Sequence, residues 1–518
     1  MKKGFTLIEL LAVILILGII ALIAIPTVNN ILKEARKGAF SSTLNNLNKA
    51  IEEKCTMEQI INQTITTGYT ISHGVISPSL DIKGDLPDGT IVVNSNCEVA
   101  FTLSNTNFTA TKDFVGDIVI LDGKTNTEMI YKESILNGTD PILSDNLIPI
   151  TIDNDGTVRK ADIKSKWYSY AEKKWANAVM LTASGKVEQD GTILENSIES
   201  YFVWIPRYKY KLFNMGNYND ALASKPAESS VTTIDIIFET KDKTISVGTN
   251  IGEYHSHPAF QAFNTNGLWV GKFETSGNTS NIKIKPNQQS LRYINIKTMF
   301  DTSYNYKRSN ESHMMKNTEW GAVTYLTLSK YGINKIVNIN NNSDRITGYS
   351  SVINIDDINF TGAYNTNASV TLPYNTETGY KASTTGNITG IYDMSGGVEE
   401  YMAAYNSESS VLGESGFSSD PASTYGSKYF DVYPSSSVRT YYNRILGDAT
   451  GELGPFYDNG IYLSSNWWDS FPFFVDEMNP WFYRGGYYGI KSRGNILSFH
   501  RYNGDEVGEN TFRIVLAN

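Results

Sequence analysis

The first 25 residues constrain this chain most, because a short basic leader and a single carboxylate precede a long apolar run. The leader reads MKKG, Glu9 is the carboxylate, and residues 10–25 carry no charge. A secretory signal would end such a run at a small-residue cleavage site, whereas here helically spaced apolar residues continue beyond Pro26. We therefore expect cleavage ahead of the apolar run, which then remains in the mature chain.

Residues 4–9, GFTLIE, resemble the class III signal of type IV pilins and type II secretion pseudopilins. The resemblance implies that a prepilin peptidase cleaves between Gly4 and Phe5, and that the new Phe5 amine is methylated. It also implies that the partners are other pilin subunits. The protein would wait in the cytoplasmic membrane as a single-pass protein before assembly, and would lie on an extracellular pilus or the cell surface afterwards.

The span from Phe5 to Val28 would rise about 36 Å as a helix, enough to cross a hydrocarbon core of roughly 30 Å with some tilt. A carboxylate costs roughly 2.5 to 3.5 kcal/mol there, so we expect Glu9 to pair with the Phe5 ammonium of a neighbouring subunit during assembly. The alternative is a plain single-span anchor in which Glu9 reaches the headgroups. Pro26 lacks an N–H and marks a weak point in the helix, as in pilins.

Composition and cysteine content narrow the partners and the compartment. The net charge of −10 argues against nucleic-acid binding, which needs a basic face. A length of 518 residues predicts two or three folded units after the helix. Cys55 and Cys97 lie on the exported side, where disulfides persist, and we expect them to pair; two free thiols are the alternative.

The chain divides into a spine, a small head and a large second unit. With residues 1–4 as leader, apolar residues at helical spacing predict a spine helix over 5–55. Alternating β-branched residues between Asn, Ser and Gly predict a small antiparallel sheet, within a pilin-like β head over 56–147. The remainder, 148–518, is predicted to be a separate α+β domain.

Inside the second unit, the aromatic segments 201–212 and 267–277 are predicted to be strands. Segment 318–332 has helical spacing and is predicted to be a helix that stops at Gly332. Two stretches rich in Asn, Ser, Thr and Gly, 335–390 and 406–440, are predicted to form long surface loops rather than core.

The order of WIPRY, WVGKFE, TEWGAVTYL, YDMSGGVEEY, RGG and FRIVL along the chain resembles the formylglycine-generating-enzyme or sulfatase-modifying-factor family, a branch of the C-type lectin fold. The resemblance implies a lectin-like α+β domain. The fold class expected for the whole chain is therefore α+β: a pilin spine helix and a small antiparallel head, followed by this domain.

The same resemblance raises an enzymatic hypothesis, which the residues disfavour. Oxidising members of that family act through a copper-binding cysteine pair, because thiolates select Cu(I), and this chain has no cysteine after Cys97. His255 and His257 in YHSHP would share one face of a strand and could hold a metal if a third ligand were present; the other interpretation is a pair of hydrogen-bonded loop histidines. We therefore predict that the protein is not an enzyme.

Structural calcium is a second expectation from the resemblance, since relatives hold it around an NVWEW turn that here reads GVEEY at 397–401. Glu400 keeps the family glutamate, but Gly397 and Glu399 replace the asparagine and the tryptophan. Asp393 and Glu400 with backbone carbonyls form the possible calcium site. The alternative for Glu400 is a solvated or capped carboxylate at a helix start.

A binding surface is the remaining expectation. Aromatic rings gather near the C-terminus, and large amphipathic rings suit both sugar stacking and protein contact, although most of them are expected to be core. The candidates for an exposed, ligand-binding group are Trp467, Trp468, Phe471, Tyr487, Tyr488 and Tyr502.

Together these features favour a large minor type IV pilin, displayed at the pilus tip and mediating adhesion through its C-terminal domain to an external glycan or protein. One alternative is a pseudopilin or priming subunit of a type II-like secretion machine. A second is a surface enzyme of the sulfatase-modifying class.

Overall fold

The computed structural model describes most of the chain, and its α+β class agrees with the sequence expectation. The described residues are 7–61, 63, 65–82, 85–93, 97–112, 118–123, 137–144, 146–165, 167–211, 233–241, 254–335, 337–351, 371–407, 412, 414–433, 445–450, 457–458, 461–462, 474–489 and 494–517, with backbone alone at 7–27, 29–30, 457–458 and 461–462. The chain divides into two compact units, Met1–Glu133 and Ser134–Asn518.

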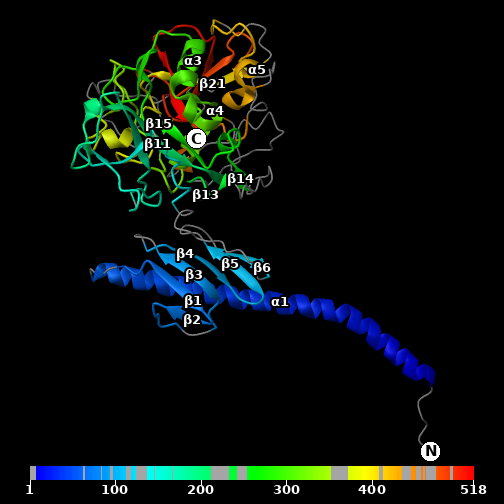
Figure 1. Ribbon diagram of the computed structural model, residues 1–518. Helices are drawn as coiled ribbons and strands as arrows, with labels where there is room; N and C mark the ends of the chain where they lie inside the picture. The colour runs from blue at the N-terminus through cyan, green and yellow to red at the C-terminus, as the bar shows by residue number, and fades with distance from the viewer. Residues whose placement is uncertain are drawn as a thin grey trace, which may run out of the picture. The chain divides into compact units, whose positions relative to one another are not determined.

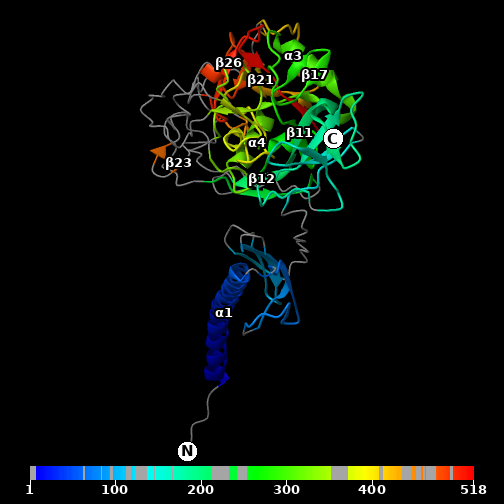
Figure 2. The ribbon, with the colours of Figure 1, turned by 90° about the vertical axis from the view of Figure 1, so that its left-hand side faces the viewer.

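The first unit is a long helix with a small sheet on one side of its C-terminal half (Figures 1 and 2). The helix α1 spans Leu7–Ile60 and is continuous through Pro26. The sheet is antiparallel with the order β2-β1-β3-β4-β5-β6. Its strands are β1 Gly68–Ser72, β2 Val75–Ser77, β3 Asp88–Val93, β4 Val99–Ser104, β5 Phe108–Lys112 and β6 Val119–Asp122.

The head is held on α1 by one apolar stripe at helical spacing. This stripe is fully buried and consists of Phe40, Leu44, Leu47, Ile51 and Cys55. Steps of three and four residues place these side chains on one face of a helix, and they share a core with the sheet. Phe40 also stacks on Phe108 of β5, with ring centroids 5.7 Å apart.

Cys55 and Cys97 form a disulfide, with Cα atoms 5.4 Å apart, so the predicted pairing is confirmed. The bridge joins the end of α1 to the residues that precede β4. It therefore closes the head covalently at the end of the buried stripe.

The second unit is built around an eight-stranded sheet with the order β10-β8-β7-β9-β11-β15-β28-β18. Of its central strands, β15 is buried along its whole length and β11 is buried at every residue except Glu199. The strands are β7 Ile148–Ile152, β8 Val158–Lys160, β9 Asn177–Leu181, β10 Thr192–Ile193, β11 Ile198–Pro206, β15 Gly267–Gly271, β18 His313–Met314 and β28 Ile514–Leu516.

A second sheet of five strands carries the C-terminal aromatic segments. Its order is β22-β21-β25-β26, with β27 also paired to β21. The strands are β21 Glu399–Asn406, β22 Asp431–Tyr433, β25 Trp481–Arg484, β26 Phe499–Tyr502 and β27 Asn510–Thr511.

Smaller sheets complete the described strands of this unit: β12 Tyr208–Lys211 with β13 Ile236–Phe238 and β14 Tyr254–Ser256, β16 Ser276–Asn278 with β17 Asn281–Lys283, β19 Tyr349–Ser351 with β20 Thr371–Pro373, and β23 Tyr457–Asp458 with β24 Ile461–Tyr462.

The described α-helices of this unit are α3 Ile296–Tyr306, α4 Asn317–Thr327 and α5 Pro421–Tyr425. The Asn295 side chain caps α3 by accepting from the Thr298 N–H. Every residue of α4 is buried, and the helix lies inside the unit in both views (Figures 1 and 2). The helix ends at Thr327 rather than near Gly332, because the chain turns at Ser329, whose hydroxyl donates to the Leu326 carbonyl.

The expectation that 335–390 forms surface loops is wrong for many of its described residues. Asn340, Ser350 and Thr384 are fully buried. They are accommodated because polar side chains find partners inside: Asn340 donates to the Ile346 carbonyl, and Thr384 Oγ1 accepts from the Ile391 N–H. Polar composition therefore does not separate loop from core here.

The unit boundary falls at Glu133/Ser134, whereas the sequence placed it at 147/148. Residues 137–144 contain no strand or helix, yet they belong to the second unit, because the indole N–H groups of Trp204 and Trp269 donate to the carbonyls of Thr139 and Ile142. The sequence pattern marked β7, which is the first regular element after them.

The bridge predicts a stability difference confined to the head. It encloses a loop with a sequence separation of 42 residues. On the chain-entropy account such a bridge contributes about 4 kcal/mol, so Cys55→Ser with Cys97→Ser should lower the unfolding midpoint of the head alone. Differential scanning calorimetry of the full chain checks this, and a shift of the second unit's transition by the same amount would contradict it.

Candidate assembly spine and candidate binding surface

The predicted processing residues, Gly4 and Phe5, lie outside the described residues. Glu9 and Pro26 lie in α1, where only the backbone is described. Within the residues whose side chains the structure describes, no helix is long and apolar enough to span a membrane.

Just ahead of the head, α1 exposes apolar side chains. Val28, Ile31 and Leu32 are 51%, 64% and 48% exposed. The buried stripe begins only at Phe40, so this part of the helix has no cover from the described part of its own unit. Exposed apolar residues in a row along a helix are typical of a surface that packs against another molecule.

In the second unit, three sequence segments far apart in the chain meet at one buried network. Glu274, from WVGKFE, accepts from the Val398 N–H at 2.9 Å. Arg513, from FRIVL, donates through Nε to Glu400 Oε2 at 2.9 Å and through a second nitrogen to Oε1. Its remaining nitrogen donates to the Gly271 carbonyl at 2.8 Å. Segments 271–274, 398–400 and 513 are thereby tied together.

Lys272, in segment 271–274, adds further hydrogen bonds to this network. Its ammonium is fully buried and donates to Asn177 Oδ1 at 2.8 Å and to the carbonyls of Ile388 and Gly390 at 2.7 and 2.8 Å. Three acceptors match the three protons of an ammonium, so the polar requirement of this buried cation is met. Burial nevertheless holds the Lys272 pKa well below its ordinary value.

The two residues of the expected calcium site take part in this network. Both oxygens of Asp393 accept from the Gly348 N–H, at 2.8 and 3.0 Å, and Oδ1 also accepts from Asn340 Nδ2 at 2.9 Å. Glu400 is fully buried in β21, so its alternative as a solvated helix-start carboxylate is wrong. Within the described residues no group of three or more His, Cys, Asp or Glu side chains is placed to hold a metal ion. Calcium at this pair stays a prediction.

Charge is unbalanced in this core, because three carboxylates share one guanidinium. Burial raises the pKa of Glu274 well above its ordinary value, and the charges of Asp393 and Glu400 raise it further. Burial also raises the Glu400 pKa, which Arg513 limits to about 6. Glu274 is the carboxyl most suited to stay neutral at pH 7. Its Oε2 contacts Ser290 Oγ, which in turn lies 3.3 Å from the Arg345 carbonyl, so a neutral Glu274 has a hydroxyl partner.

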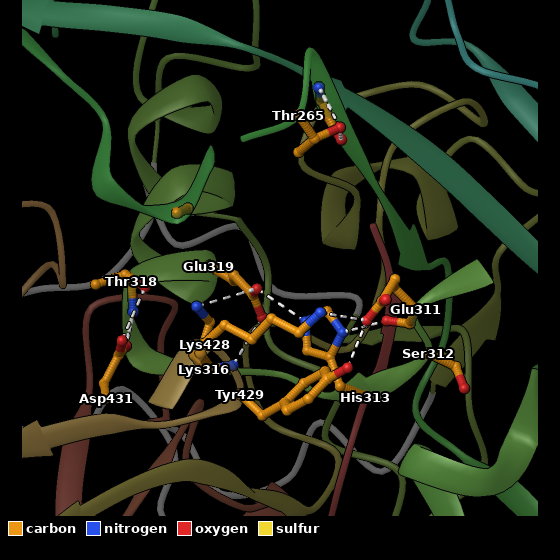
Figure 3. A network of polar contacts seen from close by, with 12 residues as sticks. Thr265, Glu311, Ser312, His313, Lys316, Thr318, Glu319, Lys428, Tyr429 and Asp431 are labelled. Atoms are coloured by element: carbon orange, nitrogen blue, oxygen red, sulfur yellow. Dashed lines mark hydrogen bonds and ion pairs between the residues drawn. The ribbon is translucent and has the colours of Figure 1, made fainter. Parts of the chain in front are cut away.

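A second polar network fixes the start of α4 (Figure 3). His313 contacts Glu319 Oε1 through Nε2 at 2.9 Å and the Glu311 carbonyl through Nδ1 at 2.6 Å. Although burial raises the Glu319 pKa, the charges of His313 and Lys316 leave it below its ordinary value. An oxygen therefore faces each nitrogen of the His313 ring.

Backbone donors at the same helix start are also satisfied. Glu319 accepts from the Lys316 N–H at 2.9 Å, and Asp431 of β22 accepts from the Thr318 N–H at 2.7 Å (Figure 3). No sequence pattern indicated the contact of Asp431 with this helix start. The sequence signal for this helix start was Glu319, which lies three residues after Lys316, the residue that precedes the helix.

His255 and His257 both lie against the Tyr210 ring, with centroids 5.9 and 5.4 Å apart. His257 is fully buried and its Nδ1 accepts from the Ala259 N–H at 3.3 Å. Both rings therefore pack against Tyr210, with His255 half-buried on β14 and His257 fully buried directly after it.

The predicted aromatic surface is described in part. Trp467, Trp468 and Phe471 lie outside the described residues. Tyr502 is 38% exposed on β26, whereas Tyr487 and Tyr488 are half-buried, with ring centroids 5.7 Å apart in an edge-to-face pair. Other rings nearby, such as Trp481 and Phe482, are fully buried, as the core interpretation expected.

The Tyr487–Tyr488 pair lies next to further residues that no sequence pattern indicated. The Arg345 guanidinium lies 5.0 Å from the Tyr488 ring centroid and pairs with Glu509, Nε to Oε2 at 3.1 Å. Tyr293 is 64% exposed, and its N–H donates to the carbonyl of Val507, two residues before Glu509. We call Tyr293, Arg345, Tyr487, Tyr488 and Glu509 the tyrosine–arginine surface.

Backbone strain accompanies this surface. Tyr293 and Arg345 have φ values of 60° and 58°, in the left-handed region that non-glycine residues rarely adopt. Such conformations cost free energy and gather at binding sites, where the surrounding structure enforces them. Neither residue is marked by a local sequence pattern, because each lies in a polar loop.

The raised Glu274 pKa predicts that the second unit loses stability as pH rises above the ordinary pKa of a glutamate. A carboxyl with a raised folded-state pKa contributes stability that is complete below its unfolded pKa, about 4.3, and is lost as pH rises through the folded value. Glu274→Gln should therefore flatten the fall in unfolding free energy of the second unit as pH rises above about 4.3, measured by denaturant titration. The exposed Glu172→Gln is the control, and equal slopes in the two variants would contradict the assignment.

Among protein-family models, the prokaryotic N-terminal methylation motif matches residues 1–25. This finding supports a type IV pilin-like N-terminus. It implies processing by a prepilin peptidase and assembly with other pilin subunits, and it fits a membrane-anchored pilus subunit. The motif overlaps the first residues of α1, and the match supports a type IV pilin-like or pseudopilin-like N-terminus.

Proposed function

We propose that this protein is a large minor type IV pilin that displays its second unit at the pilus tip for adhesion. The observation that carries the proposal is the methylation motif at residues 1–25, which leads directly into a helix with a pilin-like head packed on its C-terminal half. The exposed residues Val28, Ile31 and Leu32 supply an apolar surface for neighbouring spines.

The tip position rests on a steric argument. The second unit, Ser134–Asn518, is a compact body with its own core, and it is far larger than the head. One such unit on every subunit would crowd a fibre whose subunits pack through their spines. A sparse or terminal position removes that conflict.

A lectin-like second unit is part of the proposal. The segments that carry the resemblance, WVGKFE, YDMSGGVEEY and FRIVL, come together through Glu274, Glu400 and Arg513. A shared buried network is what a common core would require of them, so these contacts support the proposed fold.

The unit would act by binding rather than by catalysis. The tyrosine–arginine surface offers the features of a binding site: tyrosine rings, a guanidinium and a carboxylate held in fixed geometry by strained backbone. Tyr and Arg are enriched among the residues that dominate the energetics of recognition surfaces. Tyrosine rings also bury a large area at low entropic cost.

The runner-up is a pseudopilin or priming subunit of a type II-like secretion machine, which the same N-terminal motif supports. Immunogold electron microscopy of sheared pili, with antibody against the second unit, separates the two. Label at the fibre ends supports the tip pilin, label along the whole fibre contradicts the steric argument, and label that stays in the membrane favours the secretion machine.

Glu9 gives a direct test of assembly. Glu9→Val removes the carboxylate that we expect to pair with the Phe5 ammonium of a neighbour, so membrane insertion should be unchanged or improved while incorporation into pili falls at least tenfold. Quantitative immunoblots of membrane and sheared-pilus fractions measure both. Unchanged incorporation would exclude the pairing.

The tyrosine–arginine surface predicts an adhesion defect. Tyr488→Ala and Tyr293→Ala should each weaken attachment of piliated cells to their target surface by roughly 2 kcal/mol, about 30-fold, if these rings are central contacts. Tyr254→Ala, which removes a half-buried tyrosine of β14 that lies against Lys209, is the matched control. An equal loss of attachment in all three variants would contradict a role of the tyrosine–arginine surface in adhesion.

A further inference from the structure

Residues 137–144, which we call the strap, are the first described residues of the second unit, and they have neither strand nor helix. Asn137, Gly138 and Thr139 are nevertheless buried. A segment without regular structure that is buried at its entry point must be held by side chains from elsewhere. The strap's partners come from the centre of the eight-stranded sheet.

Two tryptophans on neighbouring strands bind the strap backbone. Trp204 of β11 and Trp269 of β15 are directly paired across the sheet, with ring centroids 5.3 Å apart. The Trp204 indole donates to the Thr139 carbonyl at 2.9 Å, and the Trp269 indole donates to the Ile142 carbonyl at 2.6 Å. Both rings are fully buried, so these hydrogen bonds lie away from water.

Further contacts secure the strap on both sides of the indoles. Asn137 Oδ1 accepts from the Tyr170 N–H at 3.2 Å, and Asp140 accepts from the Tyr168 hydroxyl at 2.8 Å. The hydroxyl of Thr139 donates to the Asn266 carbonyl. Bonds to several elements therefore act in parallel along a few residues of chain.

Gly138 allows the strap to approach this closely. Its φ is 76°, and a Cβ at this position would lie 2.5 Å from the Cβ of Pro206 at the end of β11. A side chain here would therefore push the strap away from the sheet. This gives a way to loosen the strap without changing a sheet residue.

We propose that the strap is a tension anchor: pulling force carried by the chain from the spine enters the second unit at residue 137 and is transferred by the strap to the paired strands β11 and β15. The proposal rests on the proposed function, because a pilus-tip adhesin is loaded between its spine and its bound target. Force then reaches the middle of the sheet, and β7, the first strand after the strap, is not peeled first.

The anchor predicts how the unit yields under load. If the strap were weak, residues 137–147 would come free before the sheet opens, which would lengthen the chain by at most roughly 35–40 Å, the extended length of this segment at 3.3–3.6 Å per residue. If the strap is the anchor, no such step precedes the opening of the sheet.

Optical-tweezers measurements on the full chain in detergent test this, with one handle ligated at exposed Gly123 and the other at the C-terminus. Wild type is expected to unfold without the early step. The Gly138→Ala variant should show the early step at a force clearly below that of sheet opening. The double variant Trp204→Phe with Trp269→Phe should do the same. An early step in wild type at a force below that of sheet opening would overturn the proposal.

Two controls separate the anchor from general destabilisation. Trp320→Phe removes another buried indole of this unit, which donates to the Ile496 carbonyl at 2.7 Å, and should keep the wild-type pattern. Moving the first handle to exposed Lys164 bypasses the strap, so the strap variants should no longer show the step. An early step in Trp320→Phe, or one that persists with the Lys164 handle, would also contradict the proposal.

The fate of the proposed function is read separately. Immunogold label absent from fibres would remove the load in the cell but would not alter the force curves. An early step in wild type, with label at fibre tips, would remove the anchor alone.

Discussion

The buried stripe of α1, from Phe40 to Cys55, is the contact on which the first unit depends. It fixes the head on the C-terminal half of one helix and leaves Val28, Ile31 and Leu32 uncovered upstream. Because α1 is continuous through Pro26, its N-terminal half is connected to the head by helical backbone. The methylation motif at residues 1–25 implies that this helix assembles with other pilin subunits.

The second unit depends on satisfying charges that it buries. Arg513 neutralises Glu400, Lys272 meets three acceptors, and Asp393 accepts backbone and amide protons. Removing one partner from such a group leaves an uncompensated buried charge, which costs far more than the pair contributes. These residues are thus structural ties between distant segments, and the binding that we propose is assigned to the surface around Tyr488 and Arg345.

Periodic features could be predicted from the sequence, and contacts between distant segments could not. The helix, the antiparallel head and the Cys55–Cys97 bridge follow from spacing and compartment, and the structure agrees with them. The strap was missed because indole hydrogen bonds leave no local pattern, and Tyr293 and Arg345 were missed because they lie in polar loops. The burial of Asn340 and Thr384 shows the same limit: their composition predicted loop, and their hydrogen-bond partners placed them in the core.

The central claim is that this chain is processed and assembled as a pilin that carries its large second unit outside. Mass spectrometry of sheared pili tests it most directly. The account predicts an N-terminal peptide that begins at methylated Phe5, recovered in the pilus fraction together with peptides from 134–518. An N-terminus that retains Met1, with no peptides of this chain in the pilus fraction, would contradict it.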